Sequence, residues 1–365
     1  MLMHIQTDNL RIRWTEVVVT PAQLHAELPL SDAATFTVHD ARKHLKRILD
    51  GLDDRLMVVV GPCSIHDPDA ARDYALRLLR LRERLLDELC LVMRVYFEKP
   101  RTTVGWKGLL NDPYLDGSFR VNDGLRLGRR LLRDLAELGV PAGCEFLDLM
   151  TPQYFSDLVG WGAIGARTTE SQAHRELASG LSCPVGFKNG TSGNLQIAVE
   201  AVLAASHPHV FLGHSKEGQS AIFATEGNPD CHVILRGGRT TTNYGPEQVG
   251  EACRLLSNAG LRERVMVDCS HANSGKDYRR QGEVLAAVAA QVAAGEGRIV
   301  GVMVESNLVA GRQAVVPGRE LCYGQSITDG CIGWEETEQV LEHLAQAVRA
   351  RRARAVAPLA YSEAF

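Results

Sequence analysis

Several common signals are missing from this sequence of 365 residues, and each absence excludes a class of protein. Basic residues are not in excess, because the formal net charge is −4 and the isoelectric point is near 6.3, which argues against a nucleic-acid-binding protein. No apolar run is long enough to cross a membrane. The first residues, MLMHIQTDNLRIRW, lack the uninterrupted apolar segment of a signal peptide. We therefore expect neither a membrane span nor secretion.

Paired cysteines and nucleotide-binding glycines are also missing. The nine cysteines include no C-x-x-C pair, which disfavours a zinc finger and a disulfide framework. Reduced thiols in a cytoplasmic protein agree best with this pattern. No G-x-G-x-x-G fingerprint follows the first apolar segment, which disfavours a dinucleotide-binding doubly wound sheet.

The sequence does contain a repeated alternation of short apolar runs and amphipathic helices, beginning at Leu56. Uninterrupted runs of β-branched residues that alternate with helices are typical of a parallel sheet covered on both sides. About eight such units indicate an α/β fold with a closed (β/α)₈ TIM barrel, and a doubly wound open sheet is the main alternative. Strands are expected at residues 56–60, 91–97, 141–147, 162–168, 183–190, 232–238, 264–271 and 298–306.

Three segments do not follow this repeat. Residues 1–50 are expected to form an N-terminal extension that contacts the barrel or another subunit, with a short strand at 16–20, a helix from Pro21 and a helix at about 39–49. Residues 51–352 form the expected barrel, with a β-hairpin at 209–230 inserted before its sixth strand. Residues 353–365 form the expected C-terminal tail.

The active site of such a barrel lies where its strands end, and each expected strand offers a charged group or a thiol there. The cations form the larger group, and their local excess in an acidic protein predicts anionic ligands, in number enough for two phosphorylated substrates. They are Arg94, Lys99, Arg101, Arg167, Lys188 and Arg236. Pairing of these cations with Glu98, Glu145 and Glu170 is the alternative.

A second group at the same strand ends offers metal ligands. Thiolate, imidazole and carboxylate together suit a divalent metal such as Mn, Fe, Zn or Co. The candidates are Cys63, His271 and Glu305, with Asp329 left open. Each also has a structural explanation, as a small core thiol, a hydrogen-bonded loop histidine or a carboxylate paired with arginine.

The motifs around these residues closely resemble the type I, microbial 3-deoxy-D-arabino-heptulosonate 7-phosphate (DAHP) synthases. The similarity runs in order from about residue 10 to about residue 350. Its motifs are GPCSIHD, YFEKPRTTVGWKG, GARTTESQ, GFKNGTSG, ILRGG, DCSHANS, GVMVESN, YGQSITD and CIGWE.

This resemblance implies a homodimeric or homotetrameric barrel that condenses phosphoenolpyruvate with erythrose 4-phosphate and releases phosphate, the entry step of the shikimate pathway. It implies one divalent metal ion on Cys63, His271, Glu305 and Asp329. It further implies that phosphoenolpyruvate binds Arg94, Lys99, Arg167, Lys188 and Arg236, and that Arg101 and Thr102 bind the erythrose phosphate.

Catalytic roles follow from this assignment as hypotheses. Lys99 is expected to protonate the new alkoxide, with a pKa lowered by burial among other cations. Glu145 is expected to orient either the attacking water or Lys188. Asp268, which the seventh expected strand carries, and His271, into which that strand runs, complete the predicted catalytic set.

The resemblance also implies feedback inhibition by an aromatic amino acid. The matching effector positions are Leu149, Pro152, Gln153, Leu177, Ser182, Phe211 and Gly213. Gly213 leaves room where phenylalanine-sensitive forms tend to carry Ser, and GNPDCHVILRGG and DCSHANSGKDYRRQ look most like the tyrosine-sensitive forms, so tyrosine is the expected effector. The alternative is that this hairpin serves only as a subunit contact.

Two other functions remain possible on the sequence. One is 3-deoxy-D-manno-octulosonate 8-phosphate synthase, which uses arabinose 5-phosphate, and the KPRT motif disfavours it. The other is a non-catalytic regulatory subunit, which the intact set of metal ligands disfavours.

Overall fold

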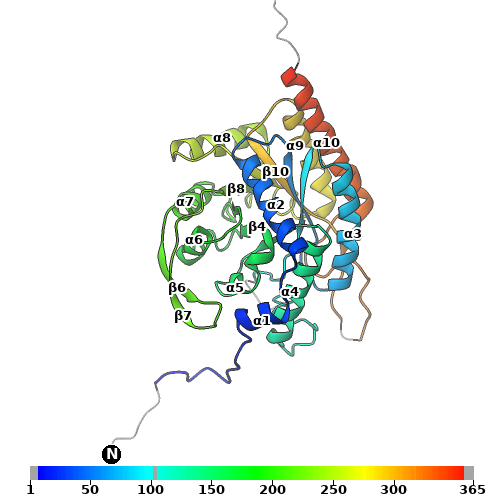
Figure 1. The fold of residues 1–365 in the computed structure, drawn as a ribbon. Helices are drawn as coiled ribbons and strands as arrows, with labels where there is room; N and C mark the ends of the chain where they lie inside the picture. Colours follow the sequence, from blue (N-terminus) through cyan, green and yellow to red (C-terminus); the bar gives the residue numbers. More distant parts are fainter. Residues whose placement is uncertain (1–6, 102–104, 317, 357–365) are drawn as a thin grey trace, which may run out of the picture.

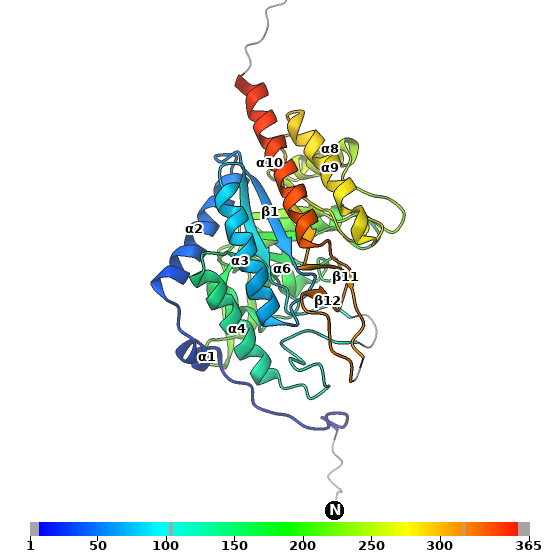
Figure 2. The same cartoon turned by 90° about the vertical axis from the view of Figure 1, so that its right-hand side faces the viewer.

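The computed structural model describes residues 7–101, 105–316 and 318–356. Parallel strands form a closed barrel in the order β1-β10-β9-β8-β5-β4-β3-β2, surrounded by helices (Figures 1 and 2). The expected TIM barrel is thus confirmed. Its strands are β1 (Leu56–Gly61), β2 (Leu89–Arg94), β3 (Ala142–Glu145), β4 (Val159–Ile164), β5 (Val185–Lys188), β8 (Cys231–Leu235), β9 (Val265–Asp268) and β10 (Ile299–Glu305).

A helical segment follows each barrel strand. These segments are α3 (Pro68–Arg84), α4 (Val121–Glu137), α5 (Pro152–Phe155) with a 3₁₀ turn (Ser156–Leu158), α6 (Gln172–Ser179), α7 (Gln196–Ala205), α8 (Pro246–Asn258), α9 (Gln281–Ala293) and α10 (Trp334–Val356). Helix α3 begins at Pro68, because the Asp67 side chain caps its first turn and proline suits its first position. Helix α10 reaches past residue 353, where the tail was expected to begin. Among the described helices, none has the length and apolar character needed to cross a bilayer.

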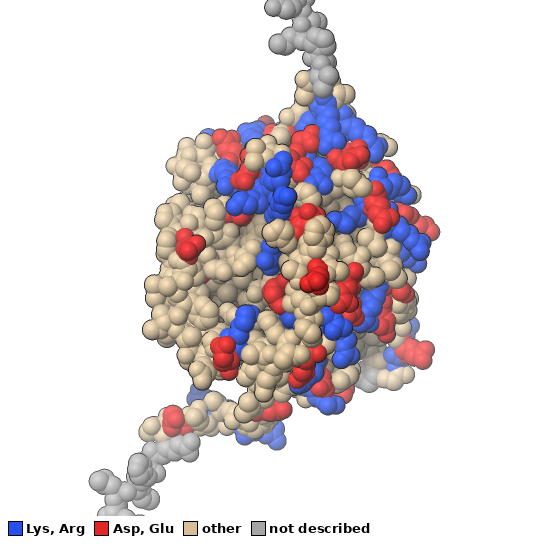
Figure 3. All heavy atoms as spheres, in the orientation of Figure 1, with Lys and Arg blue, Asp and Glu red and all other residues tan. Residues whose placement is uncertain are grey.

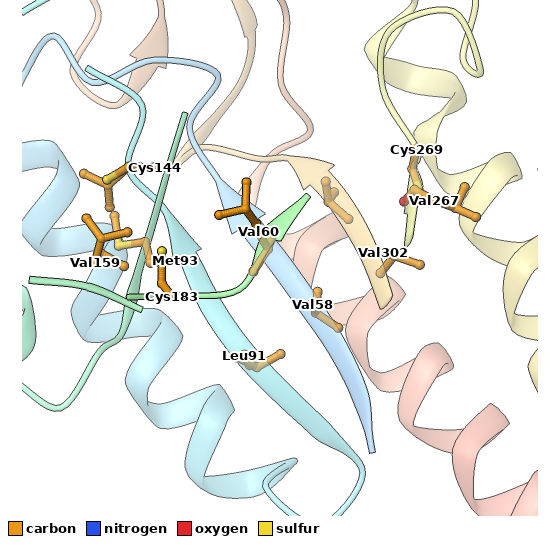
Figure 4. Close-up of a cluster of buried hydrophobic side chains, with 14 of the residues drawn as sticks. Val58, Val60, Leu91, Met93, Cys144, Val159, Cys183, Val267, Cys269 and Val302 are labelled. Carbon is orange, nitrogen blue, oxygen red and sulfur yellow. Dashed lines mark hydrogen bonds between the residues drawn. The ribbon is translucent and has the colours of Figure 1, made fainter. Parts of the chain in front are cut away.

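Alternate residues of each strand pack into two different layers. In β1, Val58 and Val60 belong to the large apolar cluster that includes the surrounding helices, whereas Met57 and Val59 belong to a smaller cluster inside the barrel. Figure 4 shows part of the larger cluster, with side chains from several strands packed together. The two-residue period therefore decides which side chains face the barrel interior.

Small residues make room for Trp161, the largest fully buried side chain and a member of the interior cluster. A Cβ atom on Gly186 would lie 2.9 Å from the Trp161 ring, and one on Gly143 would lie 3.1 Å from it. Helix α2 (Asp32–Leu49) adds Leu45 and Ile48 to the same cluster. The end of the barrel opposite the expected active site is therefore filled with side chains.

The N-terminal extension differs from its prediction in two places. Residues 16–20 form no strand, although their composition is β-prone. A closed barrel has no free edge with which a further strand could pair, and the Asn122 side chain instead hydrogen-bonds to the backbone of Val17 and Val19. The helix at Pro21 is confirmed as α1 (Pro21–Glu27), but the next helix, α2, begins seven residues earlier than expected, at Asp32 instead of His39.

The inserted hairpin is confirmed as β6 (Val210–His214) and β7 (Ser220–Ala224), an antiparallel pair between α7 and β8. It lies outside α6 and α7 at the periphery of the fold (Figure 1). Its turn reaches the N-terminal extension, because the Ala22 amide donates to the Lys216 carbonyl at 2.7 Å. A further small sheet, β11 (Val309–Arg312) with β12 (Gln325–Ser326), follows β10 and was not predicted.

His232, inside the barrel next to Trp161, predicts an acid-sensitive fold. Its Nε2 accepts a hydrogen bond from Trp161 Nε1 at 3.3 Å, and burial lowers the pKa of His232 to about 4 from the usual 6.5. Between these values the unfolded chain binds more protons than the folded chain, so stability should fall as the pH drops from 6.5 to 4. The His232 contribution to that loss is about 3 kcal/mol.

His232→Gln keeps a neutral hydrogen-bonding side chain and removes the titration. We expect the free energy of unfolding, measured by urea denaturation at about pH 7 and about pH 5, to change less with pH in this variant. An unchanged pH dependence would show that the acid sensitivity arises elsewhere.

Candidate active site

Charged residues end five of the barrel strands and follow a sixth. Because the strands are parallel, all these ends lie at one mouth of the barrel. Side chains alternate between the two faces of a strand, and each of these residues lies on the inward face of its strand. Arg94, for example, follows Val92 of the interior cluster by two residues. The residues are Arg94, Glu145, Lys188, Asp268 and Glu305, followed by Arg236 after β8.

Arg94 is 1% exposed and is compensated by the protein itself. Its Nη2 lies 3.0 Å from Glu305 Oε1, and its Nε donates to the Pro62 carbonyl at 3.1 Å. Its guanidinium also lies over the Tyr96 ring, 3.6 Å from the centroid. A buried charge needs such partners, and the same contacts fix the position of the Glu305 carboxylate.

Lys188 sits between two buried carboxylates. Its Nζ lies 3.5 Å from Glu145 Oε2 and 3.6 Å from Asp268 Oδ2. Burial alone would raise the pKa of Asp268, but the charges of His271 and Lys188 outweigh it and hold that pKa well below the usual value. The pKa of Glu145 is lowered in the same way, against burial, chiefly by Lys188 and Lys99. Both carboxylates are therefore ionised at neutral pH.

His271 is held by its neighbour Asp268. The His271 Nδ1 atom lies 2.8 Å from Asp268 Oδ2 and 2.7 Å from Ser270 Oγ, and its backbone has a φ of 54°. This strained conformation is uncommon for a non-glycine residue and is typical of functional sites. A histidine held through Nδ1 presents Nε2 on the opposite side of the ring, the arrangement often found for metal-binding histidines.

Three of the four predicted metal ligands lie together. The Cys63 sulfur and carboxylate oxygens of Glu305 and Asp329 all lie within 4.8 Å of one another, and Cys63 Sγ is 3.7 Å from Asp329 Oδ2. A hydrogen bond of 2.7 Å between Ser64 and Thr328, the neighbours of two of these ligands, ties their segments together. A thiol with two carboxylates fits a borderline divalent metal. His271 is not part of this cluster in the structure.

The predicted lowering of the Lys99 pKa is wrong. Burial does favour a lower pKa, but the nearby Cys63, Glu305 and Asp329 outweigh both burial and the repulsion from Arg94. The pKa of Lys99 is raised above its usual value, because this side chain lies next to the anionic ligand cluster. Lys99 is therefore a protonated ammonium at neutral pH.

Arg236, in contrast, has no such compensation. Its Nε atom is buried and has no hydrogen-bond partner within the described residues. Burial lowers the pKa of Arg236 despite the attraction of Asp268, and repulsion from the exposed Arg167 lowers it further. Two neighbouring cations with an orphaned buried donor mark a place for an anionic ligand.

The other predicted cationic residues follow β2. Arg101 is exposed, and its Nε donates to the Trp106 carbonyl at 2.9 Å. Thr102 lies outside the described residues. The alternative pairing of the cations with carboxylates applies to Glu145, which meets Lys188, but not to Glu98. Burial and the neighbouring Asp148 carboxylate raise the pKa of Glu98 to about 9, so Glu98 is protonated at neutral pH.

Some residues that shape the site were not predicted. Tyr96 supports Arg94, and Gln281 fixes Glu305 by accepting from its amide at 2.9 Å and donating to its carbonyl at 2.9 Å. Tyr96 shares the strand parity of Arg94, and that spacing could have indicated it. Gln281 begins a helix and carried no comparable signal.

Three of the predicted effector residues lie at the hairpin, since Phe211 and Gly213 belong to β6 and Gln153 contacts its turn. Phe211 stacks on Phe223 across the hairpin with ring centroids 5.8 Å apart, and Lys216 Nζ donates to the Gln153 carbonyl at 3.2 Å. A Cβ atom on Gly213 would lie 2.9 Å from the Phe223 ring. Of the remaining predicted positions, the structure places two as buried, Pro152 and Leu177, and two as exposed, Leu149 and Ser182.

Comparison with known proteins agrees with this geometry. Residues 23–342 match the model of the DAHP synthetase I family. The Phe-sensitive phospho-2-dehydro-3-deoxyheptonate aldolase of Escherichia coli (strain K12) is 59% identical over 350 residues, covering 96% of this chain and 100% of that protein. The Trp-sensitive enzyme of the same strain is 52% identical over 346 residues, covering 95% and 99%. The structure of phospho-2-dehydro-3-deoxyheptonate aldolase from Francisella tularensis SCHU S4 matches with a TM-score of 0.92 and 52% identity, covering 93% of this chain and 99% of that one.

The state of Cys63 predicts that metal binding releases a proton. Burial, together with Glu305, raises the pKa of the Cys63 thiol to about 11, so the thiol is protonated at neutral pH. A metal binds the thiolate, and about one proton should therefore leave when Mn²⁺ is added to metal-free protein near pH 7. Calorimetric titration in two buffers of different ionisation enthalpy measures this release.

Cys63→Ser should weaken Mn²⁺ binding, whereas Cys253→Ser, at a buried cysteine on α8, should leave both affinity and proton release unchanged. A binding enthalpy that does not depend on the buffer would contradict a protonated thiol ligand.

Proposed function

The chain belongs to the DAHP synthetase I family and is a metal-dependent 3-deoxy-7-phosphoheptulonate synthase, and on that premise we propose how its residues carry out the reaction. A DAHP synthase joins phosphoenolpyruvate to erythrose 4-phosphate, with water, and releases phosphate at the start of the shikimate pathway. The arrangement of Cys63, Glu305 and Asp329 beside the protonated Lys99 carries the proposal. The same mouth holds Arg236, whose buried Nε has no partner among the residues described.

Phosphoenolpyruvate binds the cations of β4, β5 and β8. Arg236 and Arg167 have guanidinium groups that suit bidentate contacts with phosphate or carboxylate oxygens, and Arg236 has a buried donor that finds no partner in the described part of the chain. Lys188 adds a point charge from between Glu145 and Asp268. Arg94 shapes the site through Glu305, and its bonds to Glu305, to the Pro62 and Cys63 carbonyls and to the Met303 sulfur leave one N–H of Nη1 for the substrate.

The phosphate of erythrose 4-phosphate binds Arg101 and, as the family resemblance implies, Thr102. The exposure of Arg101 at the end of the Lys99 segment is consistent with contact to a substrate that enters from solvent.

The metal, one of Mn, Fe, Co or Zn, is held by Cys63, His271, Glu305 and Asp329. When bound, it supplies Lewis-acid polarisation of the aldehyde oxygen. His271 contributes Nε2, because its Nδ1 is held by Asp268 and Ser270. The Cys63–Asp329 hydrogen bond gives way when the thiol loses its proton.

Lys99 donates the proton to the new alkoxide. Its raised pKa keeps the ammonium populated at neutral pH, and the alkoxide is a strong enough base to take a proton from it. Glu145 holds Lys188 and orients the water that adds to the phosphoenolpyruvate carbon.

We also propose a cytoplasmic homodimer or homotetramer. The support lies in the hairpin, where Val210, Leu212 and Ile222 are 70%, 79% and 73% exposed on one face. The surrounding surface over the hairpin, α6 and α7 carries few charged side chains (Figure 3). An exposed apolar patch rimmed by polar surface is typical of a subunit interface.

The proposed effector is an aromatic amino acid, bound by Leu149, Pro152, Gln153, Leu177, Ser182, Phe211 and Gly213, with the N-terminal segment of a neighbouring subunit closing the pocket. Tyrosine is favoured because Gly213 places no side chain against the Phe223 ring. The relatives described above are named Phe-sensitive and Trp-sensitive, so phenylalanine and tryptophan are the competing effectors.

Phosphate release from phosphoenolpyruvate and erythrose 4-phosphate tests the reaction and the role of Lys99 together. Metal-stripped protein should be inactive, and Mn²⁺ should restore activity. Lys99→Met should lower kcat by about 10²- to 10⁴-fold, because a positioned proton donor is lost, while phosphoenolpyruvate still binds.

Lys107→Met is the matched control, because Lys107 is exposed on the same loop and its backbone carbonyl already accepts from the Lys99 amide. Full activity of Lys99→Met would refute the proton-donor role. Faster turnover with arabinose 5-phosphate would favour the octulosonate synthase, and inactivity of the metal-loaded wild type would favour a non-catalytic subunit.

Tyrosine should inhibit the wild-type enzyme and raise its thermal midpoint, since it binds only the folded state. Gly213→Ser should weaken inhibition by tyrosine relative to phenylalanine, because the new side chain meets the Phe223 ring. Inhibition by phenylalanine or tryptophan alone would reject tyrosine as the effector. No thermal shift with any of the three would indicate that the hairpin is only a subunit contact.

A further inference from the structure

Three buried asparagines form a connected chain beneath the barrel mouth. They are Asn189 after β5, Asn243 in the loop before α8, and Asn273 after β9, with exposed fractions of 0%, 7% and 1%. The Asn243 Nδ2 donates to Asn189 Oδ1 at 3.1 Å, and Asn273 Oδ1 accepts from the backbone N–H of Asn243 at 2.9 Å. The chain thus joins three loops that are distant in sequence.

All three side chains converge on the backbone around Arg236. Asn189 Oδ1 accepts from the Arg236 amide at 2.8 Å, and Asn243 Oδ1 accepts from the Gly237 amide at 2.7 Å. Asn273 Nδ2 donates to the carbonyl of Leu235 at 3.1 Å, and Asn189 Nδ2 donates to that of Gly237 at 3.0 Å.

The loop that carries His271 also holds the backbone at Arg236. The Ala272 amide donates to the Arg236 carbonyl at 3.2 Å, and Asn273 also donates to the Asp268 carbonyl at 2.9 Å. Gly237 has a φ of 75°, and a Cβ atom there would lie 2.8 Å from the Asn273 amide. The backbone on both sides of Arg236 is therefore held by hydrogen bonds and by close packing.

These hydrogen bonds hold the backbone of Arg236 but not its side chain. Its buried Nε has no partner among the described residues. A side chain without protein partners keeps its direction only if its backbone is held. We propose that Asn189, Asn243 and Asn273 are positioning residues that pre-organise Arg236 for the anionic groups of phosphoenolpyruvate. Holding the backbone before the substrate arrives reduces the ordering that binding must impose.

This inference rests on the proposed role of Arg236, so the test is a double-mutant cycle of Asn243→Ala and Arg236→Ala. Asn243→Ala should raise the KM for phosphoenolpyruvate by about tenfold with little change in kcat, since it disturbs binding of the substrate more than the chemistry. Arg236→Ala should raise the same KM by about tenfold or more. In the Arg236→Ala background, Asn243→Ala should change KM by less than about twofold.

Asn228→Ala provides the matched control. Asn228 is also buried, and its Nδ2 donates to the carbonyls of Ala178, Leu181 and Cys183, away from Arg236. It should lower the thermal midpoint comparably and leave KM unchanged. If Asn243→Ala does not fold, Asn243→Ser shortens the side chain without adding a charge, so that it loses the bonds to Asn189 and to the Gly237 backbone amide, and it should show the same non-additive rise in KM.

The outcomes separate the two levels of inference. An unchanged KM in Arg236→Ala would overturn the proposed substrate contact itself. A raised KM in Arg236→Ala, combined with an additive or absent effect of Asn243→Ala, would leave that contact standing and overturn the positioning role.

Discussion

The site depends on one constraint, the burial of opposite charges inside a closed barrel. Inward-facing residues at the strand ends meet there. Arg94 lies 3.0 Å from Glu305, and Lys188 lies between Glu145 and Asp268. Each buried charge would be strongly destabilising alone, so the cations and anions stabilise one another's ionised forms. Removing one member would therefore disturb the pKa and position of the others, and the mouth behaves as one coupled unit.

The groups that stand outside these ion pairs agree with the chemistry of the family. The Cys63 thiol and the Asp329 carboxylate lie beside the paired Glu305, where a divalent cation fits. The cationic excess lies at Arg236 and Arg167, where a phosphate or carboxylate fits. The mouth thus holds both a cluster of metal ligands and a cationic region. A metal at one and an anionic substrate at the other would complete the balance.

Much of the fold could be predicted because the two-residue and helical periods are local properties of the sequence. The predictions that failed depend on contacts between residues that are far apart in the sequence. Residues 16–20 have strand composition, but no barrel edge is available to pair with them. Neighbouring cations in the sequence predict a lowered pKa for Lys99, whereas the residues that raise it, Cys63, Glu305 and Asp329, lie far from Lys99 along the chain. The asparagines carried no sequence signal, because a polar residue in a loop is ordinarily solvated.

The neutral character of these asparagines matters for the balance of charge. An amide both donates and accepts, so Asn189 can bind the Arg236 amide and the Gly237 carbonyl at once. An aspartate could only accept, and its charge would add to the attraction that Asp268, Glu145 and Glu305 already exert on Arg236. Rigid but uncharged support therefore keeps the guanidinium available for a ligand, which a charged network of the same shape would not do.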